Sequence, residues 1–170
     1  PIVLSKKETI QLIENTNNLK HKAILALIYS AGLRIGELLE LKKEDIDSER
    51  MLIHIKDAKG KKDRYTILSN KVLKLLRDYY KEYRPKMYLF EGQKGGKYSS
   101  ESAGQLFKRA LKKAKINKPA TLHTLRHSFA THLLEDGISI AHIQKLLGHN
   151  NLSTTLIYPH IAKDSIQNIK

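Results

Sequence analysis

The sequence contains no cysteine. This absence excludes disulfide bonds, zinc sites built from thiolates and cysteine nucleophiles, and it fits a reducing compartment. Long apolar runs are also missing, since the longest, from Ala23 to Ala31, falls well short of the roughly 20 residues that a membrane span needs. Acidic residues are few: 17 Asp and Glu stand against 31 Lys and Arg, a formal net charge of +14. We therefore expect an intracellular protein without a membrane partner, whose first candidate ligand is a polyanion.

Linkers and repeats are absent as well. No long tract of Pro, Gly or Ser interrupts the chain, and no period of 20 to 50 residues recurs, which argues against a solenoid. A chain of 170 residues, of which 41% are hydrophobic, can bury one core. We expect a single compact domain.

Apolar periodicity predicts a mainly α fold with a small antiparallel β-sheet, an α+β class. The β-branched runs at 52–55 and 65–68 flank a polar stretch at 57–63 and predict a β-hairpin. Helical spacing, with caps such as the Ser5 to Glu8 capping box, predicts the remaining elements. The expected helices cover 5–17, 19–31, 34–41, 69–84, 100–113, 124–135 and 140–147, with one or two short helices in the tail.

Arg34 is the first candidate for binding a phosphate. It follows Gly32 by two residues, so it projects from the first turn of the helix predicted over 34–41. A guanidinium donates two parallel hydrogen bonds to phosphate oxygens, and a helix N-terminus adds backbone N–H groups and a favourable dipole. The alternative is an arginine that is solvated or paired with Glu37.

The predicted hairpin turn is strongly basic. Such a run is often only a solvated turn, because turns favour polar residues whatever their function. The functional interpretation is a mobile finger that enters a nucleic-acid groove, with a lysine at its tip that donates a proton to a leaving oxygen. The basic residues of this turn are Lys56, Lys59, Lys61, Lys62 and Arg64.

Histidines gather near the end of the chain, which raises the hypothesis of a metal site. No H-E-x-x-H motif occurs and no second carboxylate-histidine pair completes a ligand set, so we expect no metal and no cofactor. His127, His132 and His142 are better interpreted as structural residues on helices.

Two further pairs of residues could carry chemistry. His123 and Arg126, three residues apart, share one helix face and could address one phosphate. Further on, His149 ends the Leu-Leu-Gly-His motif, and Tyr158 follows it on a predicted short helix. A phenol in that place is a candidate nucleophile, although a lone tyrosine is more often a surface or half-buried aromatic residue.

Taken together, these motifs resemble the tyrosine recombinase family, which includes phage integrases and Xer-type resolvases. The resemblance covers 34–160 in the family's order and near its spacings. It rests on five positions: Arg34 in A-G-L-R-I-G-E-L, Lys59 in D-A-K-G-K-K-D-R, H-T-L-R-H-S-F-A-T-H-L from His123, L-L-G-H ending at His149, and Tyr158.

The resemblance implies a role for each matching residue. Arg34 and Arg126 would clamp the scissile phosphate of DNA, with His123 and His149 as further donors to it. Lys59 would protonate the departing 5′ oxygen while Tyr158 attacks phosphorus, which leaves a covalent 3′-phosphotyrosine. Glu37 would orient the site without doing chemistry itself.

The resemblance also implies a setting. The chain would be a site-specific DNA recombinase or integrase that works without metal or ATP on double-stranded DNA, as a homo-tetramer, in a prokaryotic cytoplasm. Residues 1–170 would form one catalytic domain without the N-terminal arm of the family. The tail, 159–170, would dock on a neighbouring subunit, fold back on its own subunit or stay loose.

Two alternatives stay open at this stage. A DNA-binding module without chemistry, such as a degenerate recombinase or a regulator, would be equally basic. A type IB topoisomerase would share the phosphotyrosine chemistry, but H-x-x-R, L-G-H and a C-terminal tyrosine fit recombinases better.

Overall fold

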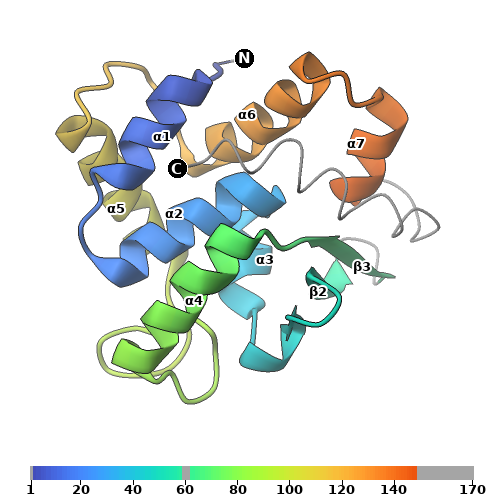
Figure 1. Cartoon of the computed structure of the whole chain (residues 1–170). Coiled ribbons are helices and arrows are strands. Elements are labelled where there is room, and N and C mark those ends of the chain that lie inside the picture. The colour runs from blue at the N-terminus through green and yellow to red at the C-terminus, as the bar shows by residue number, and fades with distance from the viewer. Residues whose placement is uncertain (1, 59–61, 149–170) are drawn as a thin grey trace.

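The computed structural model describes residues 2–58 and 62–148. The described chain is mostly helical, with one short 3-10 helix and a three-stranded sheet in the order β1-β2-β3, antiparallel throughout (Figure 1). The predicted fold class is therefore confirmed. The elements are α1 (Lys6–Glu14), α2 (Leu19–Ala31), α3 (Ile35–Glu40), η1 (Lys43–Asp45), β1 (Ile46–Asp47), β2 (Leu52–Ala58), β3 (Lys62–Ile67), α4 (Asn70–Tyr83), α5 (Ser100–Lys113), α6 (Leu122–Glu135) and α7 (Ile140–Leu146).

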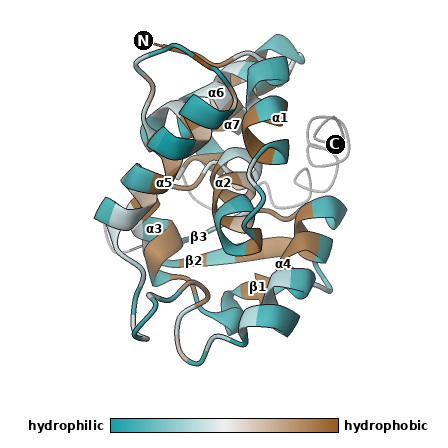
Figure 2. Cartoon of the chain, turned by 90° about the vertical axis from the view of Figure 1, so that its left-hand side faces the viewer, coloured by the Kyte–Doolittle hydropathy of each residue, from teal (hydrophilic) through white to brown (hydrophobic). Residues whose placement is uncertain are grey.

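The helix α2 forms the centre of the fold. Every residue from Ala23 to Ala31 is buried, and the helix packs against α1, α3, α4, α6 and β3. The sequence predicted a single buried stripe on this helix. That prediction is too narrow, because neighbouring elements cover the helix on all sides, and a helix that is apolar all round is a buried one. Figure 2 shows the surrounding helices turning their hydrophobic sides inward and their hydrophilic sides outward.

A sharp turn after α2 directs the chain toward the candidate phosphate site. Gly32 ends the helix in the left-handed conformation, with φ of 67°. A Cβ at this position would lie 2.7 Å from Cδ2 of Phe129 on α6, so both the backbone and the packing require glycine. Leu33 and Arg34 follow at once, and α3 then begins.

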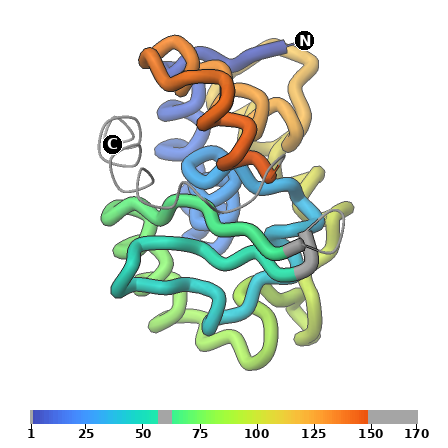
Figure 3. The backbone as a smooth tube through the Cα atoms, turned by 90° about the vertical axis from the view of Figure 1, so that its right-hand side faces the viewer, coloured from blue at the N-terminus to red at the C-terminus, as the bar shows by residue number. Residues whose placement is uncertain are grey.

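The sheet lies beneath the helices that end the described chain. Ile53 of β2 pairs with Ile46 on one side and with Thr66 of β3 on the other. The Thr66 hydroxyl donates a hydrogen bond of 2.7 Å to the carbonyl of Ala31, which fixes the sheet to the end of α2. Helix α7 contacts β3, and Figure 3 shows it descending toward the hairpin. The hairpin and the ends of α2 and α7 thus meet in one region.

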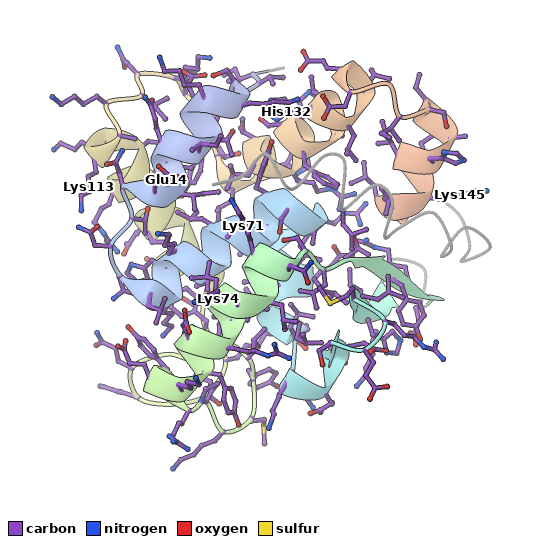
Figure 4. The ribbon with its side chains drawn as sticks, in the orientation of Figure 1. Glu14, Lys71, Lys74, Lys113, His132 and Lys145 are labelled. Atoms are coloured by element: carbon purple, nitrogen blue, oxygen red, sulfur yellow. The ribbon has the colours of Figure 1, made fainter. Side chains whose placement is uncertain are left out.

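A buried hydrogen-bond network anchors α6 to the segment before α1. The backbone N–H of Leu4 donates to the Ser128 hydroxyl at 3.0 Å, and Nε2 of His132 donates to the Leu4 carbonyl at 2.8 Å. Because Nε2 carries the proton, Nδ1 accepts from the Tyr29 hydroxyl at 2.6 Å. Burial is the main cause that lowers the pKa of His132. His132, labelled in Figure 4, is therefore a structural residue, as predicted.

No helix in the described ranges is long and apolar enough to cross a membrane.

Candidate active site

Arg34 lies at the N-terminus of α3, where the sequence placed it. It is the N-cap residue, and its extended backbone lets its N–H donate to Oε1 of Glu37 at 2.9 Å. Its side chain is one third exposed, and Nη1 lies 3.4 Å from Oε2 of Glu37. The alternative of an Arg34 paired with Glu37 is thus realised in part, but the pairing leaves the guanidinium accessible to a ligand.

Arg126 reaches the same place from α6. Its guanidinium donates from Nη1 to the carbonyl of Gly32 at 2.9 Å and from Nη2 to the carbonyl of Leu147 at 3.0 Å. It therefore joins the turn before Arg34 to the end of α7. Such bonds fix the guanidinium rigidly, which is what a preorganised anion site needs.

Glu37 is surrounded by guanidinium groups. Its Oε1 lies 2.6 Å from Nη2 of Arg64 and 3.8 Å from Nη1 of Arg126, and Arg34 contacts its other oxygen. One carboxylate thus faces three cations, and the cluster has a positive surplus. Burial, followed by the positive charges of Arg34 and Arg64, lowers the pKa of Arg126 to about 10. An added anion would relieve this repulsion, so the cluster is suited to bind a phosphate diester.

Arg64 is not where the sequence placed it. We predicted an exposed residue of the basic finger, but its exposed fraction is 2%, so it cannot reach a DNA groove. The predicted strand began at Tyr65, whereas β3 begins at Lys62. Successive side chains of a strand alternate between its faces, so this earlier start puts Arg64 on the inner face with Thr66. A prediction that started β3 at Lys62 would have put Arg64 on the same face of the strand as Thr66.

Some of the other candidates lie in the described part of the chain, and the rest lie outside it. His123 lies in the first turn of α6, exposed and one turn before Arg126. Lys56 is exposed on β2, and its ammonium lies 3.0 Å from Oδ1 of Asp45, whose hydrogen bond raises the pKa of Lys56. Lys62 begins β3, but its side chain is outside the description. Four more predicted residues lie wholly outside the described residues: Lys59, Lys61, His149 and Tyr158.

Within residues 2–58 and 62–148, no three His, Asp or Glu side chains form a group that could hold a metal ion. The described centre is a cluster of three guanidinium groups around one carboxylate, and this arrangement is suited to bind an anion. Arg34, Arg126 and Glu37 come together, as the family resemblance implies.

Comparison with known proteins agrees with this geometry. The model of the phage integrase family matches residues 3–165. The integrase/recombinase-type protein y4qK of Sinorhizobium fredii is 46% identical over 167 residues, which cover 98% of this chain and 54% of that protein. The chain spans between 54% and 66% of the length of the first two curated relatives that it matches.

Solved structures give the same result. The crystal structure of XerA recombinase has a TM-score of 0.82 and 33% identity, and the match covers 99% of this chain and 62% of that one. XerH site-specific recombinase bound to difH substrate has a TM-score of 0.78 and 28% identity, covering 93% of this chain and 50% of that one. The motifs, the cation cluster and these matches identify the chain as a member of the phage integrase family, with the fold of the tyrosine recombinase catalytic domain.

Proposed function

We propose that this chain cleaves and rejoins double-stranded DNA at specific sites through a covalent 3′-phosphotyrosine. The observation that carries the proposal is the convergence of Arg34 and Arg126, from helices far apart in the sequence, around Glu37 with an excess of positive charge. The phosphoryl group accumulates negative charge on its equatorial oxygens in the transition state, and preorganised cations stabilise that state more than the ground state.

The proposed first step is a transesterification. The phenolic oxygen of Tyr158 attacks phosphorus, and the bond from phosphorus to the 5′ oxygen breaks. Lys59 gives that oxygen a proton, and His149 or His123 takes the phenol proton. A phenol has a pKa of about 10, so Tyr158 must lose its proton during the attack. Cations around the phosphate make the resulting phenolate less costly.

The second step reverses the first with a different hydroxyl. The phosphotyrosine ester keeps the energy of the original bond, so the 5′ hydroxyl of another strand can attack it and release Tyr158. Neither ATP nor a metal is needed for this exchange. Recombination joins strands of two duplexes, so we propose that this chain acts as a tetramer on DNA. The XerH relative, which is solved bound to its DNA substrate, supports DNA as the partner.

Covalent capture on DNA tests the proposal. A pool of nicked duplexes with a randomised centre is incubated with the protein, and adducts that survive denaturation are isolated and sequenced. When the protein cuts next to the nick, the short strand with the free 5′ hydroxyl dissociates. Religation is then impossible, and the covalent adduct accumulates. We expect adducts with a shared sequence from the natural chain and none from Tyr158→Phe.

The matched control is Tyr83→Phe, which removes a hydroxyl from an exposed tyrosine on α4. It should form adducts as the natural chain does. Binding of duplex without any adduct would contradict the proposal and indicate a DNA-binding module. Adducts without a shared sequence, together with relaxation of supercoiled plasmid, would indicate a topoisomerase.

A further inference from the structure

Arg64 is the most deeply buried of the three guanidinium groups in the cation cluster. Its Nη2 donates to Oε1 of Glu37 at 2.6 Å, and its Nη1 donates to the carbonyl of Leu146 at 2.6 Å. The two acceptors come from α3 and from the last turn of α7. A single side chain of β3 therefore fixes two elements that are distant in the sequence.

The end of α7 is held by two guanidinium groups. Arg64 binds the carbonyl of Leu146, and Arg126 binds the carbonyl of Leu147. The final carbonyls of a helix lack partners within it and carry a partial negative charge, so two cations there are favourable. Gly148, with φ of 94°, follows directly, and a Cβ on it would lie 2.7 Å from Cδ of Arg64. Close packing against Arg64 thus fixes the backbone at Gly148.

Stability alone does not explain a buried arginine at this position. Replacing buried ion pairs by well-packed hydrophobic residues is often neutral or stabilising, because both charges lose their hydration. Arg64 also adds a positive charge beside Arg126, which lowers the pKa of Arg126. A residue that served packing alone would not need that charge.

We propose that Arg64 is a positioning residue for DNA cleavage. It orients Glu37, and through Glu37 the guanidinium of Arg34, and it fixes the end of α7 from which the chain continues to His149. A planar guanidinium can donate in two directions at once, whereas an ammonium at the same place cannot span both acceptors. This inference rests on the proposed function.

The decisive variant is Arg64→Lys, which keeps the charge and loses the two-directional contact. We expect normal folding, DNA affinity within about twofold of the natural chain, and single-turnover cleavage slower by about tenfold to a hundredfold, as for a small misplacement of reacting groups. The matched control is Arg77→Lys on the exposed side of α4, which should change none of these quantities.

A second substrate identifies the step that Arg64 affects. In a 5′-bridging phosphorothiolate the leaving 5′ oxygen is replaced by sulfur, which departs as a thiolate without needing a proton. This substrate therefore restores cleavage in a variant that has lost only proton donation. We expect it to rescue Lys59→Ala and not Arg64→Lys, because Arg64 acts on the anion site and on the end of α7.

Each outcome decides between the proposals. Cleavage by Arg64→Lys at the natural rate would overturn the inference and leave the proposed function standing. Loss of the folded state, or equal losses of DNA binding and cleavage, would assign Arg64 a purely structural role and also overturn it. If the natural chain forms no adduct, the proposed function fails and this inference fails with it.

Discussion

Replacing Glu37 by glutamine tests whether its carboxylate organises the cation cluster. Glutamine has nearly the same shape but no charge, and its amide nitrogen is a donor that would face donors. Glu37 accepts from the backbone of Arg34 and from Arg64, and it lies 3.8 Å from Arg126. Glu37→Gln thus leaves three guanidinium groups facing one another without a counter-charge.

The expected loss of stability follows from burial. The side chains of Glu37 and Arg64 are 10% and 2% exposed. Removing one partner from a buried ion pair costs about 3–5 kcal/mol, because the remaining charge stays unhydrated. In a domain of this size that loss lowers the melting temperature by roughly 6–20 °C. The cluster also becomes more positive, so inorganic phosphate or vanadate should stabilise the variant more than it stabilises the natural chain.

The matched control lies one turn further along α3. Glu40 is 58% exposed and pairs with Lys97 at the surface, so Glu40→Gln changes the net charge equally without opening a buried pair. Thermal unfolding with and without phosphate, and single-turnover cleavage, are measured for both variants. We expect Glu37→Gln to unfold at a much lower temperature, to respond more strongly to phosphate and to cleave more slowly. Equal melting temperatures for the two variants would refute the role of Glu37 as the counter-charge.

Three further predictions concern other parts of the molecule. Gly32→Ala should lower the free energy of unfolding in urea by about 2–5 kcal/mol, because it puts a Cβ on a left-handed backbone and against Phe129. Gly36→Ala is the control, since its Cβ meets nothing within 4 Å, and equal losses in the two variants would contradict the packing argument. The free energy of unfolding of the natural chain should fall as the pH drops below about 6.5, because His132 takes up a proton more readily in the unfolded state than in its buried site. His132→Gln should show a smaller dependence of this free energy on pH, and an equal dependence in both proteins would contradict the role of His132. Lys59→Ala should cleave normal DNA slowly and a 5′-bridging phosphorothiolate at nearly the natural rate, and absence of rescue would argue against proton donation.

The helices and the central site could be predicted because their signals are local. Caps and apolar spacing placed most helices, and the A-G-L-R-I-G-E-L motif placed Arg34 at the start of α3 beside Glu37. The approach of Arg126 to that site came from the family resemblance and not from periodicity. The structure supplies the reason, since the carbonyls of Gly32 and Leu147 hold its guanidinium.

The errors involve contacts between residues that are distant in the sequence. The extent of β3 puts Arg64 on the same face as Thr66, but its burial depends on Glu37 and Leu146, which lie 27 and 82 residues away. The two-residue strand β1 was also not predicted, because it exists only through pairing with β2 and is too short to show alternation. Local patterns find an element, and tertiary partners decide which of its side chains are enclosed.

The double attachment of Arg126 bears on the choice of an inactive variant for work on the proposed function. Truncating that arginine would delete a proposed phosphate ligand and, at the same time, the bridge between Gly32 and Leu147, so a loss of cleavage could not be separated from a loosened scaffold. Under the proposed mechanism, Tyr158→Phe removes only the phenolic oxygen of that residue and neither of these two hydrogen bonds, so it is a cleaner inactivating substitution than a change of Arg126.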